Sequence, residues 1–279
     1  MILPKFFVSS LHSVVRIVGA LSCVLGFLYL TLCAFLYFGQ ERLLFFPQKV
    51  LQRLVYPFRG FFEEIFIEVP GARLNAVLFR AERSRGVVLY FHGNAGSLLT
   101  WEPVRWPFLT AGYDVLLMDY RGYGKSTGKI QSETQFLGDA DAVYAWAKAR
   151  YSEDRILLCG RSLGSGVAAH LARKNSPRLL LLESAYFSLL DMKRRLYPFV
   201  PDFLVRYQLR SDLWLREVRC PVSLIHGRAD ALVPHDSSVQ LWPLIPRQGL
   251  FFLIDGAGHD DLSEFKEHDD AVAEILRQP

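Results

Sequence analysis

The N-terminal part of the chain carries a long stretch of apolar residues. From Ile17 to Phe38, 22 consecutive residues lack a charged side chain, and a helix of about 20 residues spans the hydrocarbon layer of a bilayer. A cleaved secretory signal has a shorter apolar region, of about 7 to 15 residues, followed by small residues. Because this stretch is longer and ends in Phe35-Leu36-Tyr37-Phe38, it predicts an uncleaved single-pass anchor within residues 1–38.

The orientation of this predicted anchor stays open. Lys5 and Arg16 precede the apolar stretch, whereas Arg42, Lys49 and Arg53 follow it. The positive-inside rule counts nearby Lys and Arg residues only. Since both flanks carry them, the pattern does not indicate which side of the membrane the rest of the chain faces.

Residues 39–60 read as a connector punctuated by prolines. Its apolar patch, Leu43-Leu44-Phe45-Phe46, either lies at the bilayer surface or packs on the following domain. Residues 61–69 and 73–79 then alternate between apolar and polar positions around the turn dipeptide Pro70-Gly71. This alternation predicts an antiparallel hairpin.

After the hairpin, short apolar segments alternate with longer helical ones. The expected strands are 86–91, 113–118, 155–159, 178–182, 222–225 and 250–254, and the expected helices are 98–110, 132–150, 165–174, one from about 235 and 262–276. This rhythm predicts an α/β domain over residues 61–279, with a mostly parallel sheet and helices on both faces.

Residues 184–216 interrupt that rhythm. They mix aromatic side chains with prolines and arginines and contain no clear strand. We therefore expect a short cap insertion that covers the edge of the sheet where open α/β folds gather their sites.

Composition narrows the range of partners. The net charge of +4 is spread along the chain, and no basic block interleaved with aromatic residues suggests nucleic-acid binding. The four cysteines lack the spacing of a zinc site, so no metal is predicted. Cys159 closes an apolar strand and is expected to be a buried, inert thiol.

Gly160-Arg161-Ser162-Leu163-Gly164 matches the pattern G-x-S-x-G, between an apolar strand and a helix that starts with small residues. In this context the serine sits on a sharp strand-to-helix turn, and glycines two positions either side relieve clashes of the tightened backbone. An ordinary glycine turn would also fit the five residues alone. The partners described next favour Ser162 as a nucleophile.

A serine hydroxyl needs an imidazole to take its proton and a carboxylate to orient that imidazole. His259 follows the last strand and is the expected base, with His226 as its rival. Asp230 follows the strand 222–225 and is the expected acid, with Glu183 in reserve. Asp236 looks instead like a helix cap, and His268 is expected at the surface.

The segment His92-Gly93-Asn94-Ala95-Gly96 follows the strand 86–91. Hydrolases present a backbone N–H to the developing oxyanion at this place, opposite the N–H of the residue after the nucleophile. Asn94 and Leu163 are the expected donors, and Ala95 could replace Asn94. We expect His92 to hold the loop by hydrogen bonding.

Together, His92-Gly93-Asn94, Asp119-Tyr120-Arg121-Gly122-Tyr123-Gly124, the G-x-S-x-G motif and Gly258-His259 resemble the α/β-hydrolase superfamily over residues 60 to 279. The anchor followed by Gln40-Glu41-Arg42-Leu43-Leu44-Phe45-Phe46-Pro47 resembles its membrane-anchored branch, which includes lipases and protein-thioester hydrolases.

This resemblance implies hydrolysis of an ester or thioester of a partly apolar acyl substrate, without metal or organic cofactor, through an acyl-Ser162 intermediate. A lysophospholipid or monoacylglycerol would suit such a site. The same triad would serve a serine aminopeptidase or amidase, and a non-catalytic membrane scaffold could share the fold. Acyl length, head group and oligomeric state do not follow from the sequence.

Overall fold

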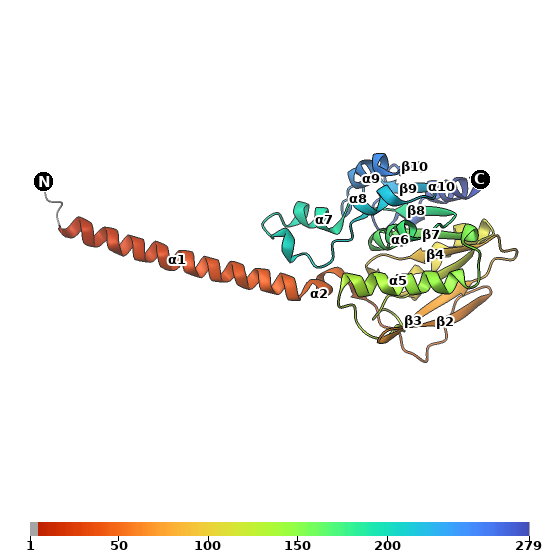
Figure 1. Cartoon of the computed structure of the whole chain (residues 1–279), viewed down its shortest axis with the longest axis horizontal. Coiled ribbons are helices and arrows are strands. Elements are labelled where there is room, and N and C mark those ends of the chain that lie inside the picture. The colour runs from red at the N-terminus through yellow and green to blue at the C-terminus, as the bar shows by residue number, and fades with distance from the viewer. Residues whose placement is uncertain (1–4, 279) are drawn as a thin grey trace.

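A computed structural model describes residues 5–278, and the side chains from residue 14 onward; residues 1–4 of the predicted anchor and Pro279 lie outside it. Its centre is an eight-stranded sheet in the order β10-β9-β8-β7-β4-β6-β3-β2 (Figure 1). The strands are β2 (Phe62–Val69), β3 (Ala72–Phe79), β4 (Val87–Phe91), β6 (Asp114–Met118), β7 (Ile156–Arg161), β8 (Leu179–Glu183), β9 (Val222–Gly227) and β10 (Gln248–Ile254). Only β3 pairs antiparallel, with β2 and with β6.

The central strands are mostly apolar because both of their faces are buried. In β4, Val87 and Leu89 belong to the core on one side of the sheet, whereas Val88 and Tyr90 belong to the core on the other. The α/β architecture predicted from the sequence is thereby confirmed.

Helices cover both faces of the sheet. One core holds residues of α5 (Glu133–Lys148) and α6 (Leu163–Lys174), and the other holds residues of α4 (Trp106–Thr110) and α10 (Lys266–Arg277). Ser132 caps α5 as expected, since its hydroxyl accepts the N–H of Gln135 at 3.1 Å.

Two local predictions were wrong. The expected helix 98–110 is split into α3 (Leu98–Trp101), a 3-10 turn and α4, with prolines at 103 and 107, which lack the N–H that a continuous helix needs. Asp236 is the first residue of α9 (Asp236–Leu241), whose capping position is His235, so it is not the cap itself.

The connector packs on the domain. It contains α2 (Gln40–Leu44) and β1 (Phe46–Pro47), and β1 pairs in parallel with β5 (Ala95–Gly96). Phe45 and Tyr56 are buried in the two cores. Of the two alternatives for this segment, the structure therefore supports packing on the domain.

Before the connector, α1 (Lys5–Phe38) extends from the domain as a long rod (Figure 1). Its 25 residues Val14–Phe38 are long and apolar enough to cross a membrane, and nearly all of them are exposed. An isolated apolar helix of this kind needs a nonaqueous environment.

Residues 184–216 divide into two parts. Residues 189–206, which we call the projecting segment, contain α7 (Leu189–Leu196) and the 3-10 turn η3 (Asp202–Leu204), and protrude from the domain beside α1 (Figure 1). The short helix α8 (Ser211–Trp214) instead contributes Trp214 to the core.

Candidate active site

Ser162 lies at the sharp turn between β7 and α6. Its backbone has φ of 51° and ψ of −118°, a left-handed value of φ that is strained for a residue with a side chain. A Cβ on Gly160 would clash with the carbonyl of Gly164, and one on Gly164 would clash with the carbonyl of Phe91. The two glycines of the motif thus permit the tight packing that holds Ser162 in this conformation.

The structure brings Ser162, His259 and Asp230 together from three separate segments. Nε2 of His259 lies 2.9 Å from Oγ of Ser162, and Nδ1 of His259 lies 2.7 Å from Oδ2 of Asp230. This geometry fits a serine hydroxyl that donates to Nε2 and an Nδ1–H that donates to the carboxylate.

Asp230 is held as a carboxylate. Its Oδ1 accepts the N–H groups of Leu232 at 3.0 Å and Val233 at 2.8 Å. Burial by itself raises the pKa of Asp230, but hydrogen bonds from His226 and His259, the charge of His259 and the Val233 N–H outweigh it, so the pKa is lowered. An ionised Asp230 favours the Nδ1–H tautomer of His259.

His226, the rival base, is fully buried. Its Nε2 donates to the carbonyl of Val233 at 2.9 Å, and its Nδ1 lies 2.7 Å from Oγ of Ser238. Nε2 is also 3.3 Å from Oδ2 of Asp230. His226 therefore supports the loop of Asp230 and has no hydrogen bond to Ser162.

Glu183, the reserve acid, faces a different partner. Its carboxylate accepts from Nε2 of His268 at 3.1 Å and from the hydroxyl of Tyr90 at 3.0 Å. His268 is buried, so its expected surface position was wrong. Burial opposes ionisation of both groups, yet their mutual attraction prevails, raising the pKa of His268 and, with Arg161 and Tyr90, lowering that of Glu183. The two residues form a buried ion pair.

Cys159 is buried beside Glu183, as expected from its apolar strand. Burial, reinforced by the charge of Glu183, raises the pKa of its thiol well above the usual value. A thiol of this kind stays protonated and is a poor nucleophile.

Arg161 is a functional candidate that sequence reasoning missed. The guanidinium is buried and donates to the carbonyls of His259 at 2.8 Å and Asp260 at 3.1 Å, and to Oγ of Ser263 at 3.0 Å. These bonds tie the end of β7 to the loop that carries His259. The available signal was a charged residue at the end of an otherwise apolar strand, directly before Ser162.

The two expected oxyanion donors flank Ser162. Leu163 is the first residue of α6, so its N–H has no acceptor within the helix. Asn94 lies in the loop after β4, and its carbonyl accepts from the N–H of Phe46 at 2.9 Å and the hydroxyl of Tyr123 at 2.6 Å. The connector therefore helps to position the loop of Asn94.

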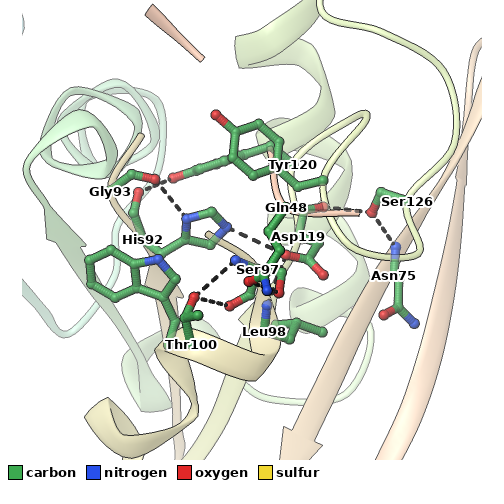
Figure 2. A network of polar contacts seen from close by, with 12 residues as sticks. Gln48, Asn75, His92, Gly93, Ser97, Leu98, Thr100, Asp119, Tyr120 and Ser126 are labelled. Atoms are coloured by element: carbon green, nitrogen blue, oxygen red, sulfur yellow. Dashed lines mark hydrogen bonds and ion pairs between the residues drawn. The ribbon is translucent and has the colours of Figure 1, made fainter. Parts of the chain in front are cut away.

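A buried polar network lies behind this loop (Figure 2). Nδ1 of His92 donates to the carbonyl of Gly93 at 2.7 Å, and the hydroxyl of Tyr120 donates to the carbonyl of His92 at 2.7 Å. The carboxyl of Asp119 accepts the N–H of Leu98 at 3.0 Å. His92 thus holds the loop by hydrogen bonding, as its place in the sequence predicted.

Burial dominates the protonation of this network. It lowers the pKa of His92 to about 4, against the opposing effect of the Gly93 carbonyl, and raises the pKa of Asp119 to about 8. Burial thus favours the uncharged form of both side chains. Their hydrogen bonds support the loop that carries Asn94.

A cavity of about 520 Å³ opens onto Ser162. Its size lies within the range of small-molecule sites, and its lining is mostly apolar. Besides Ser162, Leu163 and Asn94, the walls come from the end of α1, from the connector, from the projecting segment, and from Tyr186, Tyr207, Leu232 and Val233. The arrangement can hold a chain-like apolar group with its reacting atom at Ser162.

Comparisons with known proteins agree with this fold. A family model described as serine aminopeptidase S33 matches residues 82–213. An uncharacterised protein of Mycobacterium tuberculosis is 30% identical over 233 residues, which cover 81% of this chain and 83% of that protein. The esterase Pf2001 of Pyrococcus furiosus has a TM-score of 0.66 at 24% identity, with 83% of this chain and 98% of that chain covered.

A further relative is the lysophosphatidylserine lipase ABHD12 of Danio rerio, which is 32% identical over 184 residues. That match covers 58% of this chain and 48% of the lipase, so the chain spans about half the length of this relative. The chain belongs to the α/β-hydrolase superfamily.

Proposed function

We propose that this protein hydrolyses a carboxylic ester or thioester of a partly apolar acyl substrate, with Ser162, His259 and Asp230 as its catalytic triad. The observation that carries the proposal is the hydrogen-bonded chain from Ser162 through His259 to Asp230, together with the apolar cavity that Ser162 lines. A serine activated in this way is suited to acyl transfer.

In the first half of the reaction, Oγ of Ser162 attacks the acyl carbon while Nε2 of His259 takes the hydroxyl proton. The negative charge that develops on the carbonyl oxygen is stabilised by the N–H groups of Leu163 and Asn94. His259 then donates its proton to the leaving alcohol or thiol, and an acyl-Ser162 ester remains.

In the second half, His259 accepts a proton from water, which attacks the acyl carbon. The tetrahedral intermediate collapses, Nε2 of His259 returns the proton to Oγ of Ser162, and the carboxylic acid leaves. Asp230 keeps its charge throughout and stabilises the imidazolium in both halves.

The cavity favours an acyl ester over the amine-bearing substrate of an aminopeptidase. Within residues 5–278, no Asp or Glu is among the residues that line it. A carboxylate would be needed there to bind a substrate ammonium group. The names of the similar proteins, a lysophosphatidylserine lipase and an esterase, support the same choice.

The basic residues of the projecting segment give little support for an anionic head group. Lys193 and Arg194 both pair with Asp202, and Arg195 pairs with Asp191 at 2.7 Å. Because these cations are already partnered, we base the substrate class on the apolar cavity.

We also propose that α1 anchors the enzyme in a membrane as a single pass. Its 25 apolar residues Val14–Phe38 exceed the length that spans the hydrocarbon layer. Extraction of isolated membranes with alkaline carbonate tests this: an anchored protein stays in the pellet, whereas release into the supernatant would contradict the anchor.

The test of the catalytic proposal uses full-length protein in detergent. Wild type and Ser162→Ala are treated with a fluorophosphonate, and then hydrolysis of p-nitrophenyl esters of graded chain length is measured. We expect labelling and hydrolysis in the wild type, and a loss of both in Ser162→Ala, with a fall in kcat of about 10⁵ to 10⁶.

Two controls make this result interpretable. Ser165→Ala alters a neighbouring serine whose hydroxyl donates to the carbonyl of Ser162 at 2.7 Å, and it should still label. An alanine p-nitroanilide substrate reports on aminopeptidase activity. Absence of labelling in folded wild type, or hydrolysis of the anilide in preference to esters, would overturn the proposal.

A further inference from the structure

The cavity at Ser162 reaches the C-terminal end of α1, next to the domain. Its lining includes Leu36 of α1, Leu43 of α2, and Met192, Leu196 and Val200 of the projecting segment. One continuous apolar space therefore joins the nucleophile to the last turn of α1. This contact between anchor and cavity is not needed for anchoring.

The end of α1, α2 and the projecting segment form one wall of the cavity, and polar contacts hold this wall in place. The side-chain amide of Gln40 donates to the carbonyl of Leu204 at 2.6 Å and accepts the N–H of Arg206 at 2.8 Å. The carboxylate of Glu41 pairs with Arg206 at 2.8 Å and accepts the hydroxyl of Tyr207 at 2.9 Å. Gln40 and Glu41, which follow the anchor, thus connect α2 to the projecting segment by hydrogen bonds and an ion pair.

The projecting segment also runs along α1. The hydroxyl of Tyr29 donates to the carbonyl of Phe199 at 3.0 Å. Tyr29 lies nine residues before Phe38, which is about 14 Å along a helix, and a span of 25 residues is about 38 Å long. The hydrocarbon layer is about 30 Å thick, so the helix span is longer than the layer. Even if the whole of this excess length lies outside the layer at the domain end, the Tyr29 contact is at least about 6 Å below the surface of the hydrocarbon layer.

The tip of the projecting segment is apolar and exposed. Phe199 is 56% exposed and Phe203 is 81% exposed, and Leu196 and Tyr197 are also exposed beside them. Large apolar side chains gathered in this way mark a surface that contacts another apolar phase. Because they adjoin α1, the phase they fit is the same bilayer.

We propose that the end of α1, α2 and the projecting segment form an acyl-chain entrance embedded in the bilayer, through which a lipid ester with one long acyl chain reaches Ser162. This inference rests on the proposed function and adds the substrate class and its route. An acyl chain that moves from the bilayer into this cavity remains in apolar surroundings, so its methylenes are not exposed to water on the way to Ser162.

The test of the wall uses full-length protein in phospholipid nanodiscs. Leu36→Trp and Leu43→Trp each narrow the cavity, and Leu25→Trp is the matched control, because Leu25 lies on the same helix and is exposed. The measured quantity is the ratio of kcat/KM for p-nitrophenyl palmitate to that for p-nitrophenyl butyrate. We expect this ratio to fall about tenfold or more in the first two variants and to stay unchanged in the control.

Different failures have different meanings. If wild type neither labels with the fluorophosphonate nor hydrolyses butyrate, the proposed function fails. If it does both, but the ratio is the same in all variants, the wall is not part of the acyl site and this inference fails alone. Should the Trp variants not fold, Leu36→Ala and Leu43→Ala test the same wall, and an unchanged ratio there would equally overturn it.

The route through the bilayer has its own test. Phe203→Asp places a carboxylate at the exposed tip, and Val239→Asp does so at an exposed position of α9, away from α1. We expect Phe203→Asp to slow hydrolysis of palmitate in nanodiscs about tenfold or more but not in detergent micelles, since a charge is costly in hydrocarbon. Equal rates for the two variants in nanodiscs would contradict membrane entry.

Discussion

Two hydrogen-bonded pairs of a carboxylate and a histidine lie near the same edge of the sheet. Asp230 and His259 are 2.7 Å apart, and Glu183 and His268 are 3.1 Å apart. The first pair reaches Ser162 and the cavity, whereas the second is enclosed with Tyr90 and Cys159 under α10. Residue type and strand-end position are therefore shared, and only the first pair has access to a nucleophile.

We propose that enclosure separates the catalytic pair from the structural one. His259 sits on a loop and is partly exposed, so it can exchange protons with substrate and water. His268 lies on a helix and is held in a charged pair with Glu183, which makes it unavailable as a base. Arg161 lies between the two pairs, since it bonds the His259 loop and its charge lowers the pKa of Glu183.

The largest expected effect separates the two carboxylates by activity. Asp230→Asn should reduce kcat about 10⁴-fold, because the amide no longer favours the correct tautomer of His259. Glu183→Gln should leave kcat within about threefold. The carboxylate of Glu183 bonds His268, whereas the N–H of Ser162 donates at 3.0 Å to the backbone carbonyl of Glu183, which the substitution keeps. Hydrolysis of p-nitrophenyl butyrate measures both. A similar loss in the two variants would mean that the pairs are not functionally distinct.

Next in size is the effect of the enclosed pair on stability. Glu183→Gln leaves His268 without its buried counterion, which should lower the free energy of unfolding by about 3 kcal/mol. That corresponds to a fall in Tm of roughly 6–12 °C, measured by thermal unfolding in detergent. Asp191→Asn, which breaks the exposed pair with Arg195, is the control and should change Tm by less than about 3 °C.

Arg161 should show an intermediate effect on activity. Arg161→Gln loses the bonds to the carbonyls of His259 and Asp260, and misplacement of His259 should lower kcat by up to about 10². KM for butyrate should stay within about twofold, because Arg161 does not line the cavity. Arg178→Gln, at an exposed position, serves as the control, and an unchanged kcat in Arg161→Gln would refute the positioning role.

The smallest effect is a dependence of stability on pH. The pKa of His268 is raised above 6.5, so its contribution is complete below pH 6.5 and is lost as the pH rises through the folded-state pKa. The pKa of Glu183 is lowered below 4.5, so its contribution is complete above pH 4.5 and is lost as the pH falls through the folded-state pKa.

We therefore expect the Tm difference between wild type and the double variant Glu183→Gln/His268→Gln to be largest between about pH 4.5 and 6.5. It should shrink by about 3 °C or more toward alkaline pH. A difference that is constant from pH 5.5 to pH 9 would show that the pair carries no net charge effect.

Much of the domain could be predicted from patterns along the chain. Strands such as Val87–Phe91 are continuous apolar runs because both faces of the sheet are buried. Ser162, His259 and Asp230 follow the ends of strands, where a parallel sheet gathers its loops, and for this reason the sequence predicts that the three distant residues meet. Their catalytic roles stay a prediction until the labelling experiment is done.

Other features were missed because they depend on contacts between distant segments. The burial of His268 comes from its packing against Glu183, 85 positions earlier in the chain. The role of Arg161 depends on carbonyls 98 and 99 positions later. Neither periodicity nor a motif predicts such partners, because their polar groups pair only when tertiary packing buries them together.

By itself, the sequence determined the α/β class, the apolar N-terminal helix and the candidate nucleophile with its partners, because these follow from local periodicity and motif spacing. Only the tertiary structure decided which carboxylate meets which histidine and that the connector packs on the domain. It also decided that the end of α1 lines the cavity at Ser162. Those outcomes depend on close packing of segments remote in the chain, where shape, burial and hydrogen bonding are settled together.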